Sequence, residues 1–285
     1  MDCSNLSLEE KIKIAENNIW EWHEYWKGKV YVAFSGGKDS ICLLHLVRLM
    51  FPKIPAVYYS IGIEFPEVMK IIKTTNNIQI IKPRISFKKV LQNYGYPIVS
   101  KETAFKIREA RNTSSSYLRN MRIIGDLGKY NSGIPVKYRY LLEAPFLISE
   151  KCCNIFKKEP SFRYVKETRR RPMIGVKAKD SQQRESSQKR YGCNAFHLRN
   201  PQGRPIMSWS DEDAWAYIKW YQLEYPALYD MGWSQTGCVA CGFGITNEVS
   251  PNRFERMRKT HPKLWNYCIK KLGYAKVLDF MHIPY

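Results

Sequence analysis

The sequence predicts an α/β protein with a doubly wound, mainly parallel sheet of five to six strands, helices on both faces, and a helical, cysteine-rich C-terminal region. Three observations support this fold class. Short apolar runs alternate with segments of helical apolar spacing, as in βαβ units. A glycine turn joins the first apolar run to the helix that follows it. The chain has 285 residues, 44% of them hydrophobic, which is enough to bury a sizeable core.

The first third of the chain alternates between predicted helices and strands. Apolar residues at helical intervals predict a helix over residues 8–26, and the run 30–34 predicts the first strand. A second helix reaches about Met50. The same criteria predict strands at 56–60 and 79–83, each followed by a helix, the later one spanning 86–94.

The pattern loosens in the middle of the chain. Glycine and proline interrupt residues 111–145, so we expect a loop-rich insertion there. A further strand is expected at 172–176. Ser210, followed by three acidic residues, predicts a capped helix that runs to Tyr221, because a serine hydroxyl accepts from the first amides and acids favour the helix dipole.

Charge and cysteine content narrow the class of protein. The net charge of +20 favours a polyanionic partner or substrate, although a merely solvated basic surface is the alternative. Eight cysteines favour metal or redox chemistry over structural disulfides in an intracellular chain. No stretch approaches the 18 consecutive apolar residues of a membrane span, and no signal peptide is evident. We therefore expect a cytoplasmic protein that does not associate with a membrane.

The turn between the first strand and its helix has the composition of a phosphate-binding loop. Glycines let a backbone approach a phosphate, and the amides at a helix N-terminus favour the anion. The spacing differs from the Walker pattern Gly-x4-Gly-Lys-Ser/Thr. We expect these residues to bind a nucleotide: Ser35, Gly36, Gly37, Lys38, Asp39 and Ser40.

Two pairs of cysteines form the second motif. Cys152 and Cys153 are adjacent, and Cys238 and Cys241 form a Cys-x-x-Cys pair 85 residues beyond. Four thiolates can bind Zn²⁺ or hold an iron–sulfur cluster, and the spacing alone does not choose between them. Adjacent ligands are unusual in structural zinc sites, which favours iron–sulfur. Cys193 is a further candidate, as a ligand, a sulfur carrier or a small buried thiol.

The two motifs together carry a family resemblance. Ser-Gly-Gly-x-Asp-Ser at the end of the first strand resembles the PP-loop of the ATP pyrophosphatases, within the adenine nucleotide alpha hydrolase-like superfamily. Residues 152–160, 209–215 and 236–241 resemble the cluster-bearing adenylyl-sulfate and 3′-phosphoadenylyl-sulfate (PAPS) reductases. That resemblance implies cleavage of ATP between its α and β phosphates. It also implies one [4Fe–4S] cluster on Cys152, Cys153, Cys238 and Cys241.

Three departures place the chain among the ATP-using members. The reductases carry a nucleophilic cysteine in a Glu-Cys-Gly-Leu-His-type tail, which the sequence 278–285 lacks, and they usually degrade the loop that is intact here. The family's Asp-Thr-Gly is replaced by Ser60-Ile61-Gly62, so Glu64 and Glu67 are the candidates to substitute for its carboxylate, through Mg²⁺, and plain dipole partners at a helix start are the alternative. The chain thus resembles most closely the sulfurtransferases of DNA phosphorothioation.

The resemblance implies a site and a domain organisation. We expect Lys38, Asp39 and Cys193 to be catalytic, and Gly62, Glu64, Lys177 and Arg184 to join the loop in binding the nucleotide. Residues 1–28 would form an N-terminal helix, 29–230 the nucleotide-binding domain, and 231–285 the Cys-x-x-Cys loop with a helical tail.

The expected function is adenylylation of a substrate for sulfur transfer, on a nucleic acid. The expected cofactors are ATP, Mg²⁺ and a [4Fe–4S] cluster, with zinc as the alternative to the cluster. The expected partners are DNA or RNA, a sulfur donor such as a cysteine desulfurase, and a second copy in a homodimer. Two alternatives remain open: a sulfonucleotide reductase that releases sulfite, and a non-catalytic iron–sulfur protein that binds nucleotides and nucleic acids.

Overall fold

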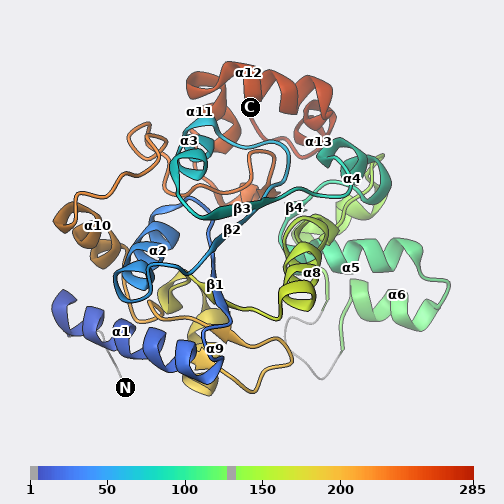
Figure 1. The fold of residues 1–285 in the computed structure, drawn as a ribbon. Helices are drawn as coiled ribbons and strands as arrows, with labels where there is room; N and C mark the ends of the chain where they lie inside the picture. The colour runs from blue at the N-terminus through green and yellow to red at the C-terminus, as the bar shows by residue number, and fades with distance from the viewer. Residues whose placement is uncertain (1–5, 127–132) are drawn as a thin grey trace. The chain divides into compact units, whose positions relative to one another are not determined.

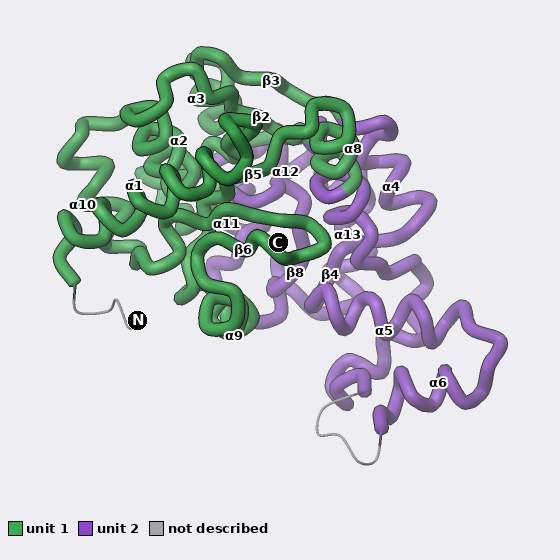
Figure 2. The backbone as a smooth tube through the Cα atoms, turned by 60° about the horizontal axis from the view of Figure 1, so that its bottom comes forward, with its two compact units in different colours: residues 1–60, 64–82, 159–236 green, residues 61–63, 83–158, 237–285 purple. Residues whose placement is uncertain are grey.

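The computed structural model describes residues 6–126 and 133–285, and it divides the chain into two compact units (Figure 2). Unit 1 comprises residues 1–60, 64–82 and 159–236, and unit 2 comprises 61–63, 83–158 and 237–285. These units group residues that lie close together in space, whereas the boundaries predicted at residues 28 and 230 were placed from the positions of the sequence motifs.

Unit 1 contains the predicted sheet. Its strand order is β3-β2-β1-β5-β7-β6, and every neighbouring pair is parallel except β6 with β7 (Figure 1). The mainly parallel α/β fold is therefore confirmed. The elements of unit 1 are α1 (Leu8–Tyr25), β1 (Val30–Ala33), α2 (Lys38–Met50), β2 (Ala56–Tyr59), α3 (Pro66–Thr74), β3 (Ile78–Ile81), α8 (Glu159–Thr168), β5 (Arg171–Ile174), the 3₁₀ helix η3 (Ala178–Asp180), α9 (Gln182–Tyr191), β6 (Asn194–Ala195), β7 (Gln202–Gly203) and α10 (Asp211–Trp220).

Helices cover both faces of this sheet, as predicted. Alternate side chains of a strand point to opposite faces. On one face Tyr31 of β1 and Val57 of β2 pack with Tyr164 of α8, and the rings of Tyr31 and Tyr164 meet edge to face at 4.8 Å. Figure 1 shows α1 and α2 on the other side of the sheet. Trp22 of α1 lies so close to β7 that a Cβ on Gly203 would come within 2.9 Å of its ring.

Helix starts in unit 1 follow their capping residues. The Ser210 hydroxyl accepts from the Asp213 amide at 3.2 Å, and the Asp213 carboxylate accepts from the Ser210 amide at 2.7 Å, which confirms the predicted cap of α10. The same carboxylate accepts a hydrogen bond from the buried Lys11 ammonium at 2.7 Å. This ion pair joins α10 to α1.

Unit 2 holds a small parallel sheet of β4 and β8, with Ile98 opposite Gly242 and Val99 opposite Phe243. Its elements are α4 (Phe87–Tyr94), β4 (Ile98–Val99), α5 (Lys101–Asn112), α6 (Ser116–Ile123), the 3₁₀ helix η1 (Val136–Glu143), α7 (Lys151–Cys153), the π-helix η2 (Asn154–Lys158), β8 (Gly242–Phe243), the 3₁₀ helix η4 (Ile245–Asn247), α11 (Arg253–Thr260), α12 (Pro262–Asn266), the π-helix η5 (Tyr267–Lys271) and α13 (Tyr274–Phe280).

The segment expected to be a loop-rich insertion is partly helical. Residues 116–123 form α6, and 136–143 form η1, whereas 127–132 lie outside the described residues. The Ser115 hydroxyl accepts from the Leu118 amide at 3.2 Å and so caps α6. None of the residues of α6 is buried, and its apolar residues Leu118, Met121 and Ile123 are only partly covered.

Within the described ranges, no helix is long and apolar enough to cross a membrane.

Candidate functional site

The predicted nucleotide loop lies at the centre of the sheet of unit 1. It follows β1, whose neighbours are β2 on one side and β5 on the other. Chain connections leave such a central strand in opposite directions, and ligands of open α/β sheets bind at this switch point beyond the carboxyl ends of the strands. The loop runs directly into α2, whose N-cap is Gly37. The first amides of a helix have no acceptor in the preceding turn, so those that follow Lys38, whose own amide donates to the Tyr229 hydroxyl, can donate to an anion.

Hydrogen bonds inside the loop hold its shape. The Ser40 hydroxyl donates to the Gly37 carbonyl at 2.8 Å and accepts from the Ser35 amide at 3.2 Å. The Ser35 hydroxyl lies 3.1 Å from the Ser40 hydroxyl. The Lys38 amide donates to the Tyr229 hydroxyl at 3.0 Å. The loop is therefore tied both to itself and to the segment after α10.

Three positions in and beside the loop require glycine, for different reasons. Gly36 has a φ of 73°, in the left-handed region that favours glycine. A Cβ on Gly37 would lie 2.5 Å from the Thr236 hydroxyl oxygen, so this position has no room for a side chain. Gly175, just after β5, allows a similar approach, because a Cβ there would lie 2.9 Å from the Asp39 carbonyl oxygen.

Two lysines and three aspartates form an ion-pair network beside the loop. The Lys177 ammonium donates to Asp39 at 2.6 Å and also to Asp211, and it lies 3.8 Å from Asp180. The Lys38 ammonium lies 3.4 Å from Asp211 and 4.0 Å from Asp39. Both lysine side chains are buried, with 2% of Lys177 and 6% of Lys38 exposed. The network therefore places two cations at the start of α2.

The network keeps its members charged. Burial favours a neutral Lys177, but its hydrogen bonds to Asp211 and Asp39 outweigh burial, and the pKa of Lys177 is raised above its ordinary value. Burial likewise opposes the charge on Asp211, yet the hydrogen bond from Lys177 and the charges of Lys177 and Lys38 lower the pKa of this carboxyl. The Lys177–Asp211 pair thus remains ionic at neutral pH.

Three further predicted residues have contacts or geometry of their own. Arg184 of α9 pairs with Asp180, which itself lies next to Lys177. Glu64 accepts a hydrogen bond from the Ser60 hydroxyl at 2.6 Å, in the segment that follows β2. Gly62 has a φ of 84° and open space around its Cα, and it belongs to unit 2.

Sequence reasoning missed Asp211 and Tyr229 as members of this site. Asp211 was expected only as an acid that favours the start of α10, and the structure gives it two lysine contacts besides. Tyr229 binds the loop through its hydroxyl, and Lys38 lies 5.6 Å from its ring centroid. The resemblance in residues 209–215 contained Asp211, so that signal was present in the sequence.

Four cysteines line one pocket of unit 2. Cys152 and Cys153 end α7, while Cys238 and Cys241 flank a turn in which the Cys241 amide donates to the Cys238 carbonyl at 3.0 Å. The other residues that line the pocket are Phe87, Pro97, Phe156 and Lys157. In residues 6–126 and 133–285, no group of three or more His, Cys, Asp or Glu side chains is arranged to hold a metal ion. The cluster therefore stays a prediction.

Neighbouring elements brace the Cys-x-x-Cys turn. The Arg253 guanidinium donates to the Cys241 carbonyl at 2.7 Å, and the Tyr274 hydroxyl donates to the Ala240 carbonyl. Gly242 pairs with β4 so tightly that a Cβ on it would lie 2.8 Å from the Pro97 carbonyl oxygen. The C-terminal end of the turn is thus held through its backbone carbonyls and through the pairing of Gly242.

Two lysines, Lys101 and Lys157, lower the pKa of one of these thiols. The hydrogen bond from Cys152 lowers the pKa of Cys153, with help from the charges of Lys101 and Lys157, while the same bond and burial raise the pKa of Cys152. The negative charge of a Cys238 thiolate raises the pKa of Lys157. Sequence reasoning did not assign Lys157 to this site, although it lies four residues after Cys153, the spacing of neighbours on one helix face.

The other cysteines that the structure describes differ from these four, and Cys3 lies outside the described residues. Cys193 is half-buried in unit 1, and its carbonyl accepts from the Arg204 amide at 2.9 Å. Cys42 and Cys268 are fully buried, and burial raises the pKa of each thiol, so both act as packing residues.

A family match covers most of this chain. The family described as "Phosphoadenosine phosphosulfate reductase domain" matches residues 29–126 and 131–243. The chain is similar to an uncharacterised protein of Methanocaldococcus jannaschii, with 25% identity over 85% of this chain and 41% of that protein. This chain therefore spans less than half the length of that relative.

Two further proteins carry names that describe an activity. An adenosine 5′-phosphosulfate reductase of Bacillus cereus is 22% identical over 83% of each chain. The crystal structure of a phosphoadenylyl-sulfate reductase from Candida auris, a phosphate complex, covers 84% of this chain and 97% of its own, with 12% identity and a TM-score of 0.44. Because the family match covers most of the residues from 29 to 243, the chain belongs to the phosphoadenosine phosphosulfate reductase domain family, a family of enzymes with a nucleotide-binding α/β fold.

Proposed function

We propose that this chain is an ATP pyrophosphatase of the PAPS reductase family that adenylylates an acceptor for sulfur transfer. The observation that carries the proposal is the pair of buried lysines, Lys38 and Lys177, held by Asp39 and Asp211 at the start of α2. Cleavage of ATP at its α phosphorus requires positioning and neutralisation of charge more than a protein nucleophile. The loop supplies both.

The chemistry follows from the residues at the loop. An acceptor oxygen attacks the α phosphorus of ATP, the bond to the β-phosphate oxygen breaks, and pyrophosphate leaves with the developing charge. The amides at the start of α2 and the two lysine ammonium groups neutralise that charge. A sulfur nucleophile from the donor then attacks the acceptor atom to which the adenylylated oxygen is bonded. The bond between that atom and the oxygen breaks, and AMP leaves with the oxygen.

Mg²⁺ fits the carboxylates of this site. It usually binds one or two protein carboxylates together with substrate phosphates. Asp39 is the carboxylate of the loop itself, with 23% of its side chain exposed, so it is our candidate ligand. Glu64, hydrogen-bonded to Ser60, is the second candidate.

The donor set of the cysteine pocket fits an iron–sulfur cluster. Four thiols share the pocket with Lys157, which offsets thiolate charge. In this proposal Cys152, Cys153, Cys238 and Cys241 hold a [4Fe–4S] cluster, which would supply an electron-rich site for the sulfur to be transferred. Cys193, which belongs to unit 1, is our candidate sulfur carrier.

A balance of products tests the proposal. Anaerobically purified protein is incubated with ATP, Mg²⁺ and a nucleic-acid acceptor, and pyrophosphate and AMP are measured. The proposal expects equal amounts of both, and loss of both in Lys38→Met. The matched control is Lys13→Met, because Lys13 is exposed on α1. If the protein released no pyrophosphate under any of these conditions, the proposal would fail.

A sulfonucleotide reductase is the second candidate, favoured by the similarity to the Bacillus cereus enzyme. Release of sulfite from adenylyl sulfate or its 3′-phosphate, with a thiol reductant, would support it. Cys268 is a poor candidate for its nucleophile because the thiol is fully buried and its pKa is raised. Loss of sulfite release in Cys193→Ser would instead assign that role to Cys193.

A further inference from the structure

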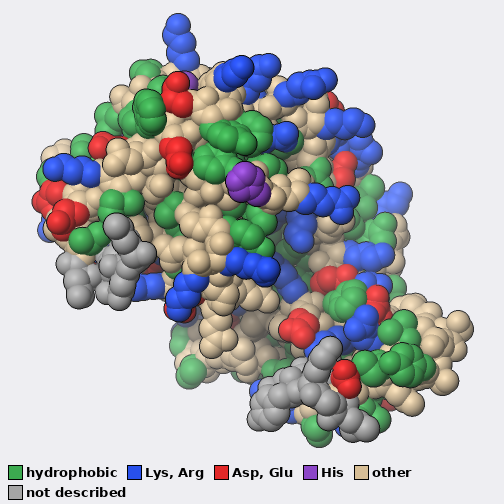
Figure 3. Space-filling view, turned by 90° about the horizontal axis from the view of Figure 1, so that it is seen from below, with side chains coloured by type: hydrophobic (Ala, Val, Ile, Leu, Met, Phe, Trp, Pro, Cys, Tyr) green, Lys and Arg blue, Asp and Glu red, His purple; other side chains and the backbone are tan. Residues whose placement is uncertain are grey.

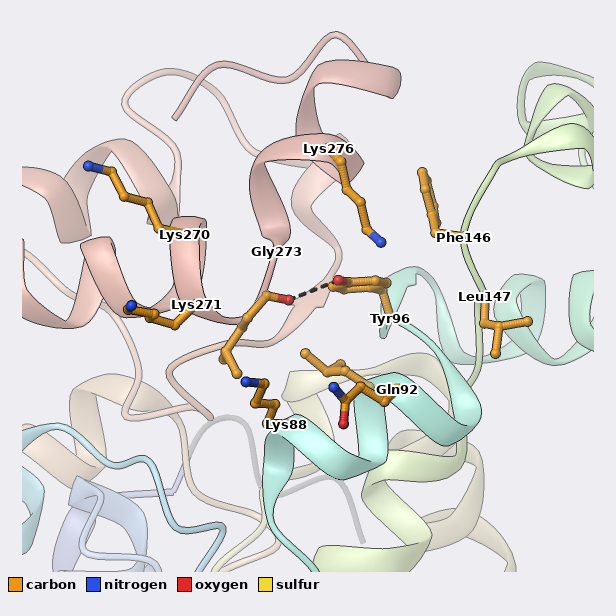
Figure 4. Close-up of a pocket in the computed structure, with 11 residues that line it drawn as sticks. Lys88, Gln92, Tyr96, Phe146, Leu147, Lys270, Lys271, Gly273 and Lys276 are labelled. Carbon is orange, nitrogen blue, oxygen red and sulfur yellow. Dashed lines mark hydrogen bonds between the residues drawn. The ribbon is translucent and has the colours of Figure 1, made fainter.

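A basic cavity of about 400 Å³ lies in unit 2, outside both candidate sites (Figure 4). We call it the lysine pocket. Its lysines come from three elements, namely α4, η5 and α13. The residues that matter for its chemistry are Lys88, Lys270, Lys271, Lys276, Gln92 and Tyr96.

The positive charge of the lysine pocket is not balanced by the protein. No carboxylate lines it, and within the described part of the chain none of its four lysines forms an ion pair. Other basic side chains of unit 2 do have acidic partners, such as Arg108 with Glu150 at 2.9 Å. Four lysines line this concavity, and Figure 4 shows that the side chains of Lys270 and Lys271 extend outward from it. Lysines gathered in one place favour an anionic ligand.

Several contacts hold the side of the pocket that Tyr96 forms. The Tyr96 hydroxyl donates to the Leu272 carbonyl at 2.8 Å, as Figure 4 shows, and the Lys276 ammonium lies 5.6 Å from the Tyr96 ring centroid. Gly273 has a φ of 76°, and a Cβ there would lie 2.9 Å from the Tyr96 hydroxyl. These contacts hold the Tyr96 wall of the cavity in place before a ligand binds.

The number of lysines distinguishes between ligands. A single phosphate monoester carries a charge of about −1.5 to −2 at neutral pH, which would leave the four lysines largely uncompensated. Consecutive phosphodiesters of a nucleic acid carry one charge each and are spaced along a chain. Figure 3 shows Lys and Arg side chains exposed at several places on one face of the molecule. The charge count thus favours several phosphates over one.

The pocket is also connected to the cysteines within unit 2. The Tyr96 ring meets the Tyr274 ring edge to face at 5.0 Å, and the Tyr274 hydroxyl donates to the Ala240 carbonyl, inside the Cys-x-x-Cys turn. A polymer held at the pocket is therefore anchored to the same compact unit as the thiols. We propose that the lysine pocket binds consecutive phosphates of a nucleic acid and so docks the acceptor, an assignment of role that rests on the proposed function.

Binding of an oligonucleotide without ATP tests the docking by itself. The probes are labelled single-stranded DNA and RNA of about twelve nucleotides, a length within the usual 4–16 per binding site. The variant replaces Lys88, Lys270, Lys271 and Lys276 with Gln. The matched control replaces four exposed lysines of unit 1 with Gln, namely Lys13, Lys53, Lys70 and Lys73, and so removes the same charge. Anisotropy gives the Kd between about 50 and 200 mM salt.

The expected result is a Kd that rises at least about tenfold in the pocket variant and much less in the control. The slope of log K against log salt should become shallower by roughly 3, at about 0.7 for each of four phosphate contacts on a single strand. Equal losses in both variants would overturn the proposal. So would displacement of the oligonucleotide by inorganic phosphate at matched phosphate concentration, or a pocket variant that loses binding only to phosphatidylserine vesicles.

Acetylation of lysines in the unaltered protein guards against a variant that fails to fold. The oligonucleotide should protect Lys270 and Lys276 from acetylation and leave Lys13 and Lys53 reactive, and absence of that protection contradicts the docking. The proposed function is read separately, from pyrophosphate release by the unaltered protein. Protection of the lysines without release of pyrophosphate would support the docking and refute the proposed function. Release of pyrophosphate without protection would support the proposed function and refute the docking.

Discussion

Lys177→Met tests whether the ion-pair network beside the nucleotide loop stabilises unit 1. Lys177 is 2% exposed and bonds Asp39 at 2.6 Å and Asp211. Met has a similar shape, so the change removes the charge and largely keeps the packing. Two carboxylates then lose their main counter-charge. Removing one partner of a fully buried pair costs about 3–5 kcal/mol, and exposed pairs contribute about 0–1 kcal/mol.

The exposure of the aspartates sets the expected size of the effect. Asp39 is 23% and Asp211 56% exposed, so water stabilises both carboxylates in part. We expect the free energy of unfolding to fall by about 2 kcal/mol, between the two limits. With a urea m-value near 2 kcal/mol/M, the midpoint shifts by roughly 1 M.

Urea unfolding, followed by tryptophan fluorescence, measures this shift. The matched control is Lys179→Met, two residues away and exposed, which should change stability by less than about 0.5 kcal/mol. In the double variant with Asp211→Asn the two losses should not add, since one variant removes the partner of the other. Equal midpoints for Lys177→Met and Lys179→Met would refute the reasoning.

Three further predictions concern other parts of the chain. Gly37→Ala should abolish ATP cleavage, because its Cβ would lie 2.5 Å from the Thr236 hydroxyl oxygen, and Thr236→Ala should restore part of the activity. Cys152→Ser should lose iron, acid-labile sulfide and visible absorbance after anaerobic purification, whereas Cys42→Ser should keep all three, since Cys42 packs in unit 1. Asp213→Asn should flatten the acid dependence of stability. Burial raises the pKa of Asp213, but hydrogen bonds from Lys11 and from the Ser210 backbone outweigh burial, so the folded pKa lies below the ordinary value. The contribution of Asp213 to stability is therefore complete above about pH 3.9 and is lost as pH falls through the folded pKa.

Each of these predictions has a contradicting result. An alanine at Gly37 that leaves turnover unchanged would mean that the loop is not the nucleotide site. The cluster assignment would be contradicted if the purified protein contained zinc and no iron, and if Cys152→Ser kept all of that zinc. Zinc is a d¹⁰ ion and would give no visible absorbance. Equal slopes of stability against pH below pH 4 for Asp213→Asn and the unaltered protein would show that the Asp213 pair contributes nothing.

The central sheet could be predicted because local signals and tertiary contacts agree there. The apolar run of β1, the glycines after it and the capping serine of α10 each indicate one structure, and the structure has it. The strands β6 and β7 were not predicted, since two residues each are too short for a periodic pattern. Helix α6 was not predicted because all of its residues are at least partly exposed.

The site could be predicted only in part. The loop and the cysteines are contiguous motifs, and their residues can be read from the sequence. The Lys177–Asp211 pair joins residues 34 positions apart, and only the packing of η3 beside α10 brings them together. The lysine pocket combines α4, η5 and α13, which no sequence spacing connects. The sequence motifs therefore predict the kinds of site in this chain, whereas long-range packing decides which charged side chains lie together.

The fate of the α phosphorus of ATP tests the account most directly. ATP labelled at that position is incubated with the anaerobic protein, Mg²⁺ and an oligonucleotide, and the labelled products are separated. The account predicts that the label passes to AMP through an adenylylated acceptor, with one pyrophosphate released for each AMP, and that Lys38→Met stops both. Label recovered in ADP, or sulfite released from a sulfonucleotide with no cleavage of ATP, would contradict it.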